Sequence, residues 1–275
     1  MNTPPLCSSC PYPSSPTGYA YKHEKGKETG RYAKIKRYES EGACRRLGKN
    51  FRSSALYQKA LRRKQRNATR PRHIDKIVIL GDSVAYGYGT KGGIARHLED
   101  SFPDSEVLNF GINGLTSDGL VERLRADHWQ AELAQADLVL LNIGGNDLLR
   151  QYRDGGASEL IRQFAALKKK YRRNLLEIYG FIQKSNDQVL IVQNSLYNSM
   201  KKEVQYFGFT NLLFRMWNSA IGAKGVIVTN TRKMGKVPSI WLDSIHPNEE
   251  GYAIMHQLLL ETLQTTGIAV IKDRR

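Results

Sequence analysis

The clearest indication of the fold is the segment Lys76-Ile77-Val78-Ile79-Leu80-Gly81-Asp82-Ser83. Residues 76–80 form a short, mostly apolar run rich in β-branched side chains, and Gly81 ends it. A short run of this kind, without polar alternation, is typical of a strand buried on both faces of a parallel sheet. The polar pair Asp82-Ser83 therefore falls at the carboxyl end of a central strand.

The same pattern recurs along the chain, where short apolar runs alternate with longer amphipathic segments. Further strands are predicted at residues 106–110, 136–143, 188–193 and 225–229, and helices at residues 93–101, 117–126, 158–183 and 248–263. Ser117 is the expected N-cap of the second of these helices. Strands that alternate with helices indicate a parallel sheet covered on both faces. In such a sheet the functional site lies at the carboxyl ends of the strands.

Positive charge is concentrated in the first quarter of the chain. The net charge is +16, but residues 1–72 hold 18 Lys or Arg and only four acidic residues, which leaves +2 for residues 73–275. Residues 1–72 are also rich in Pro, Ser and Gly, so we expect a basic, mostly disordered N-terminal arm, followed by one domain over residues 73–275. The arm is either a plain charged tail or a segment that binds nucleic acid or an anionic surface.

The sequence predicts no cofactor, no metal site and no membrane span. Cys7 and Cys10 form a C-x-x-C pair, but only Cys44 and His23 remain to complete a zinc site. No apolar run reaches the ~18–20 residues that cross a bilayer. The first 30 residues also lack the apolar stretch of a secretory signal. As the sequence stands, it predicts a cytoplasmic protein; a different start site would leave a secreted or membrane-associated protein as the alternative.

Residues that could take part in catalysis occur at four places, three of them just after a predicted strand. Ser83 follows the first strand, Gly111 the second and Asn146 the third, and Asp243 and His246 precede the last helix. Because the carboxyl ends of parallel strands meet at one edge of the sheet, we expect these groups to lie close together.

These residue types suit acyl transfer. A serine hydroxyl is a weak nucleophile until a base takes its proton, and histidine has the pKa for that work. We therefore predict Ser83 as a nucleophile, with His246 as its base and Asp243 holding the imidazole in one tautomer. The predicted donors to an oxyanion are the Asn146 side chain and the backbone N–H groups of Ser83 and Gly111.

In this order the four blocks resemble those of the SGNH hydrolases, also called GDSL esterases and lipases, which contribute Ser, Gly, Asn and His. The resemblance covers residues 76–267 and implies a flavodoxin-like three-layer α/β/α sandwich with a parallel five-stranded sheet. It implies a serine hydrolase that cleaves small acyl-ester or lipid-like substrates through an acyl-enzyme on Ser83. The arrangement is most similar to bacterial lysophospholipase-type members, and carbohydrate O-acetylesterases and thioesterases of the same family remain open.

Two other features leave alternatives open. Gly87-x-Gly89-x-x-Gly92 matches a dinucleotide-binding pattern, but it begins six residues beyond the predicted strand instead of at its end. Residues 194–223 are dense in apolar side chains and fit either a lid or acyl-binding wall, or an extra core helix. Six aromatic residues are candidates for lining an acyl pocket, with core packing as the alternative role: Tyr86, Tyr88, Tyr197, Phe207, Trp217 and Trp241.

Overall fold

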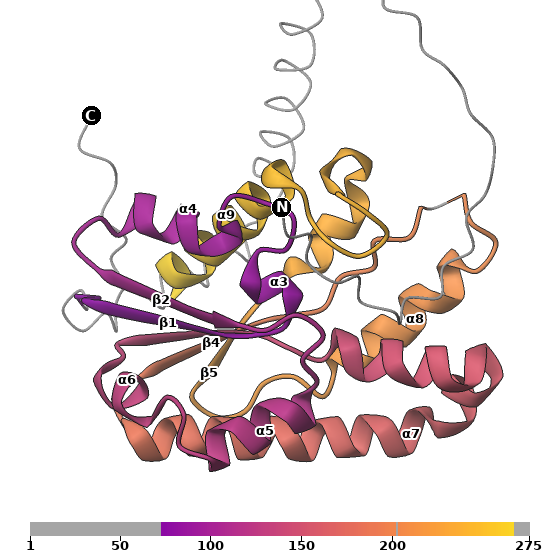
Figure 1. Ribbon diagram of the computed structural model, residues 1–275. Coiled ribbons are helices and arrows are strands. Elements are labelled where there is room, and N and C mark those ends of the chain that lie inside the picture. The colour runs from indigo at the N-terminus through magenta and orange to yellow at the C-terminus, as the bar shows by residue number, and fades with distance from the viewer. Residues whose placement is uncertain (1–72, 202, 267–275) are drawn as a thin grey trace, which may run out of the picture. The chain divides into compact units, whose positions relative to one another are not determined.

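The computed structural model describes residues 73–201 and 203–266, in which the elements surround one parallel sheet (Figure 1). The five strands are β1 (Lys76–Gly81), β2 (Glu106–Gly111), β3 (Leu138–Asn142), β4 (Leu190–Asn194) and β5 (Val226–Thr229). Their order in the sheet is β2-β1-β3-β4-β5, and every pair is parallel. This is the flavodoxin-like order, whose switch point lies between β1 and β3. The predicted fold class is confirmed; the basic arm lies outside the described residues.

Helices cover both faces of the sheet (Figure 1). One face carries α3 (Ser83–Tyr86), α4 (Gly93–Ser101) and α9 (Glu249–Thr265), and the other carries α5 (Ser117–Arg125), α6 (Gln130–Gln135), α7 (Gly145–Ser185) and α8 (Phe207–Asn218). Two 3-10 helices, η1 (Thr231–Lys236) and η2 (Pro238–Ile240), lead from β5 toward α9. Among the described residues, none of the helices is long and apolar enough to cross a membrane.

The sequence of β1 is apolar because both faces of the strand pack against a core. Val78 and Leu80 point into the core under α5 and α7, whereas Ile77 and Ile79 point into the core under α4 and α9. All four side chains are fully buried, so a polar residue at any of these positions would lose its contact with water. The two apolar layers hold β1 as an inner strand, between β2 and β3.

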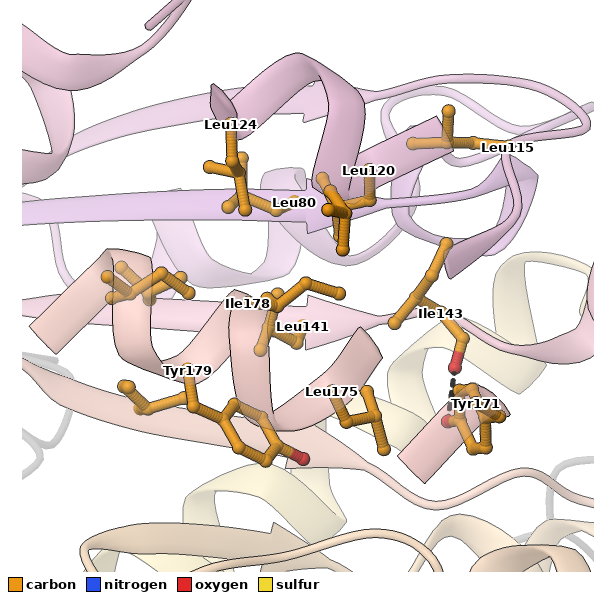
Figure 2. Packing of buried hydrophobic residues seen from close by; sticks show 14 of the residues in the cluster. Leu80, Leu115, Leu120, Leu124, Leu141, Ile143, Tyr171, Leu175, Ile178 and Tyr179 are labelled. Atoms are coloured by element: carbon orange, nitrogen blue, oxygen red, sulfur yellow. Dashed lines mark hydrogen bonds between the residues drawn. The ribbon is translucent and has the colours of Figure 1, made fainter. Parts of the chain in front are cut away.

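Helix α7 covers the core on the α5 side of the sheet, and it also holds the end of β3 in place. Leu175 and Ile178 pack near Leu141, as Figure 2 shows. The Tyr171 hydroxyl donates a hydrogen bond of 2.8 Å to the carbonyl oxygen of Ile143, the residue that follows β3. This bond holds the chain at the point where it leaves the sheet for the site.

Several element boundaries differ from those expected. The predicted helix at residues 158–183 is the second part of α7, which begins at Gly145 and bends at Gly156, where φ is 69°. Glycine is the residue that adopts such a φ without strain, so it permits the bend. The N-cap of α5 is Thr116, whose hydroxyl accepts from the Gly119 N–H, and not Ser117. Ser117 instead donates its backbone N–H and its hydroxyl to the buried Asp147 carboxylate.

Candidate active site

The turn between β1 and α3 presents Ser83 at the carboxyl end of β1, an inner strand of the sheet. Asp82 is the N-cap of α3, where its Oδ1 accepts from the Val84 N–H at 3.0 Å and from Asn142 Nδ2 at 3.1 Å. Burial raises the pKa of Asp82 to about 7. Ser83 is the first residue of the helix, so its backbone N–H has no partner within the helix.

The loop before α9 brings a histidine and a carboxylate to this serine. His246 Nε2 lies 2.9 Å from Ser83 Oγ, and His246 Nδ1 lies 2.7 Å from Asp243 Oδ2. The other carboxylate oxygen of Asp243 accepts from the backbone N–H groups of Ile245 at 2.8 Å and His246 at 2.7 Å. Partial burial acts to raise the pKa of Asp243, but these hydrogen bonds lower it below its ordinary value. The aspartate is therefore held as an anion against the imidazole.

Residues from β4 onward hold this loop in place. The Tyr197 hydroxyl donates to the Ile245 carbonyl at 2.9 Å, and the Ser199 hydroxyl donates to the Ser244 carbonyl. The ring of Trp241 packs on that of Tyr197, with 4.8 Å between their centroids. Tyr197 and Trp241, two of the predicted pocket residues, thus contact the loop that carries His246.

Tyr88, one of the aromatic candidates from the sequence, contacts His246. Its ring packs on the imidazole of His246, with a centroid separation of 4.5 Å. Leu242 lies in the same region, because its N–H donates to the His246 carbonyl at 2.8 Å and its side chain contacts Gly89. The side chains of Tyr88, Leu242 and Tyr86 are all substantially exposed. The glycines at 87, 89 and 92 therefore belong to a loop packed against the histidine, beyond α3, and not to a strand-end turn.

The predicted oxyanion donors do not all come together as expected. Asn146 lies at the start of α7, and its Nδ2 donates one hydrogen to the Leu115 carbonyl at 3.0 Å, which leaves the second amide hydrogen available. The Gly111 N–H, in contrast, donates to Asn109 Oδ1 at 2.9 Å, so it is already occupied. A Cβ at Gly111 would lie 2.2 Å from the Tyr86 nitrogen, so this glycine lets β2 and α3 pack closely.

Gly114 offers the free backbone N–H that Gly111 lacks. It adopts a φ of +75°, it is exposed, and within the described part of the chain its N–H has no hydrogen-bond partner. It directly precedes Leu115, whose carbonyl binds Asn146. The Asn113-Gly114 dipeptide is a turn signal just after β2, and it is the feature of the sequence that could have pointed to this residue.

Trp217 does not line a pocket, contrary to the expectation for it. Its side chain has 0% of its surface exposed, and its ring stacks on Tyr171 with 4.5 Å between centroids and 6° between planes. The physical reason is that Trp217 lies on the side of α8 that faces the sheet core. Among residues 73–201 and 203–266, no group of three His, Cys, Asp or Glu side chains is arranged to hold a metal ion; Cys7 and Cys10 lie outside these ranges.

Comparisons with known proteins identify relatives of this chain in sequence and in fold. An uncharacterised protein of Bacillus subtilis (strain 168), YpmR, is 24% identical over 211 residues, which cover 70% of this chain and 82% of that protein. Among solved structures, the lipase Lip_vut3 from a goat rumen metagenome has a TM-score of 0.60 at 19% identity, covering 68% of this chain and 97% of its own. Axe2, an acetylxylan esterase from Geobacillus stearothermophilus, has a TM-score of 0.52 at 19% identity, covering 73% and 97%.

TesA is a third structural relative, with a TM-score of 0.53 at 21% identity over 70% of this chain and 99% of its own. At these identities the likeness to solved structures shows the fold. The family follows from the sequence match to the model of the GDSL-like Lipase/Acylhydrolase family, which spans residues 79–254 and hence well over half of the chain. The chain belongs to the GDSL-like lipase/acylhydrolase family, and it is a carboxylic ester hydrolase.

Proposed function

We propose that this protein cleaves acyl esters through an acyl-enzyme on Ser83. The observation that carries the proposal is the unbroken chain of hydrogen bonds from Ser83 Oγ through the His246 ring to Asp243 Oδ2. In this arrangement His246 Nε2 accepts the hydroxyl proton as Ser83 Oγ attacks the ester carbonyl carbon. Asp243 stabilises the imidazolium that forms. We assign this activity to a domain formed by residues 73–275.

The tetrahedral intermediate needs donors for its oxyanion, and we propose three. They are the Ser83 N–H, the second amide hydrogen of Asn146, and the N–H of Gly114 in place of Gly111. As the intermediate collapses, the imidazolium gives its proton to the leaving alkoxide, and the acyl group stays on Ser83. A water molecule then attacks the acyl carbonyl, with His246 as base, and releases the carboxylic acid and the free serine.

The side chains around the nucleophile favour an apolar acyl group. Tyr88 and Leu242 flank the histidine and leave much of their apolar surface open to solvent. This supports a lipid-like or aromatic ester, of the lysophospholipase or general esterase type, over an acetyl group on a carbohydrate. Because the structural relative Axe2 is an acetylxylan esterase, O-acetylesterase activity is the alternative that a substrate screen must address.

The test is hydrolysis by the full chain and by its Ser83→Ala variant. We expect the full chain to hydrolyse p-nitrophenyl esters, and we expect the variant to lose the activity while its melting temperature stays the same, because only a partly buried hydroxyl is removed. A series of acyl chains from acetyl to palmitoyl, with lysophospholipids and an acetylated sugar, then assigns the substrate class. Unchanged turnover in Ser83→Ala would show that Ser83 is not the nucleophile.

A further inference from the structure

Helix α8 presents an apolar stripe to solvent. Phe209, Leu212 and Met216 recur at intervals of three and four residues and so lie along one side of the helix. Val204 and Tyr206 precede the helix, and all five side chains have between 41% and 61% of their surface exposed. Trp217, on the side toward the sheet, is fully buried. The helix therefore carries apolar side chains that do not pack in the core. An exposed apolar patch of this kind marks a contact surface.

The segment that contains this stripe is predominantly positively charged. Between residues 188 and 242 the sequence holds seven Lys or Arg and one acidic residue, a net charge of +6, although residues 73–275 as a whole carry +2. Lys201, Arg215, Arg232 and Lys236 are exposed. In the part of the chain that the structure describes, none of these four cations forms an ion pair. Their charge is therefore available to an anionic partner.

This surface is connected to the catalytic loop. Asn198 Nδ2 donates to the hydroxyl of Thr210 in α8 at 3.1 Å, and the Asn198 carbonyl lies against Gly235 of η1. The next residue, Ser199, donates to the carbonyl of Ser244 in the loop that carries His246. Figure 1 shows α8 at the same end of the sheet as α3, where Ser83 begins its helix. A partner bound at α8 would thus lie on the side from which substrate reaches the serine.

We propose that this region, the α8 surface, docks the protein on an anionic lipid surface. We define the α8 surface as the apolar stripe 204–216 together with its exposed cations. The apolar side chains enter the boundary between headgroups and acyl chains, and the cations lie among the anionic headgroups. Charge complementarity favours such a lipid surface over a neutral apolar partner. The inference rests on the proposed ester hydrolysis only in that docking would bring the serine close to ester-bearing lipids.

The test compares binding of full-length variants to vesicles by co-sedimentation. The vesicles contain equal parts of phosphatidylcholine and phosphatidylglycerol, or phosphatidylcholine alone. The apolar test variant is Leu212→Ser/Met216→Ser, and its matched control is Leu176→Ser, an equally exposed leucine on α7. The charge test variant is Arg215→Glu, and its control is Lys224→Glu, an exposed lysine just before β5. Every variant keeps residues 1–72, so their charge contributes equally to each measurement.

We expect the unsubstituted protein to bind the anionic vesicles more tightly than the neutral ones. The Leu212→Ser/Met216→Ser variant should lose affinity for anionic vesicles about tenfold, because two half-exposed apolar side chains no longer enter the bilayer. Arg215→Glu should lose about tenfold at low ionic strength. Both controls should bind as the unsubstituted protein does. All variants should hydrolyse soluble p-nitrophenyl acetate at the rate of the unsubstituted protein. This hydrolysis tests the proposed function, whereas vesicle binding tests docking, so failure of one is distinguished from failure of the other.

Three results would overturn the proposal. The first is equal vesicle binding by the α8 variants and their controls, which would assign any lipid affinity to another part of the chain. The second is no binding to either vesicle, or equal binding to both, by the unsubstituted protein. The third is a dimer that Leu212→Ser/Met216→Ser converts to a monomer, because the stripe would then be an interface between two copies of this chain.

Discussion

Replacing Asp243 by Asn separates the electrostatic role of this residue from its structural one. The Asp243 Oδ1 atom accepts from two backbone N–H groups, at Ile245 and His246, and Oδ2 faces His246 Nδ1. In Asp243→Asn the amide oxygen can keep both backbone bonds, which preserves the loop. The amide nitrogen then faces Nδ1 and, being a donor, requires Nδ1 to be the unprotonated ring nitrogen. The proton must reside on Nε2, so Nε2 can no longer accept the proton of Ser83.

The expected loss follows from this change of tautomer. The corresponding change in serine hydrolases with a Ser-His-Asp triad lowers kcat about 10⁴-fold, which is about 5.5 kcal/mol of transition-state stabilisation. Asp243→Ala should be at least as inactive and should also melt at a lower temperature, because the N–H groups of Ile245 and His246 lose their acceptor. The carboxylate of Asp243 is partly exposed, so water can replace part of that loss.

The assay is steady-state hydrolysis of p-nitrophenyl butyrate, with thermal melting of each variant. Asp104→Asn is the matched control, since Asp104 is exposed and lies away from the site. We expect kcat of Asp243→Asn to fall about 10⁴-fold while its melting temperature stays within about 2 °C of the unsubstituted protein. A fall of less than tenfold, with the fold intact, would mean that the imidazole does not depend on Asp243 for its tautomer and would contradict this prediction.

Three further changes test the rest of the site and its support. Asn146→Ala should lower kcat about 10²–10³-fold with little change in KM; a higher KM at unchanged kcat would instead assign Asn146 to substrate binding. Tyr171→Phe leaves the Ile143 carbonyl and the Gln193 amide without their buried partner. The free energy of unfolding should fall by about 1–3 kcal/mol and the melting temperature by at least about 2 °C. An unchanged melting curve would contradict this. Burial raises the pKa of Asp82 to about 7, so the folded protein retains a proton that the unfolded chain releases, and stability should fall as the pH rises from about 4 to about 7. In Asp82→Asn that fall should be smaller, and parallel curves of melting temperature against pH for the two proteins would show that Asp82 does not contribute.

Much of the architecture followed from local patterns. The run at residues 76–80 predicted a strand buried on both faces, and β1 is that strand. Its alternate side chains enter two separate cores, and that requires apolar residues throughout. Helix boundaries were less well predicted, because the choice between Thr116 and Ser117 as cap depends on Asp147, which is distant in sequence and draws Ser117 inward.

Residues at the site divide in the same way. Ser83, Asp243 and His246 could be predicted to lie together because each follows or precedes a recognisable element, and in the structure hydrogen bonds connect the three side chains. Gly111 was expected to supply an oxyanion donor, but the side chain of Asn109 occupies its N–H. Hydrogen-bond partners of a backbone group depend on the folded path of the loop, which periodicity in the sequence does not encode.

Local patterns in the sequence were enough to predict the sheet, its two covered faces and the placement of a serine, an aspartate and a histidine at one edge, because hydrophobic periodicity and strand ends are local properties of the chain. Only the tertiary structure decided that Tyr88 packs on His246, that Trp217 belongs to the core and that α8 keeps an apolar stripe in solvent. These outcomes depend on which segments meet across the fold. The local sequence around an aromatic residue is the same whether a distant helix or water covers its side chain.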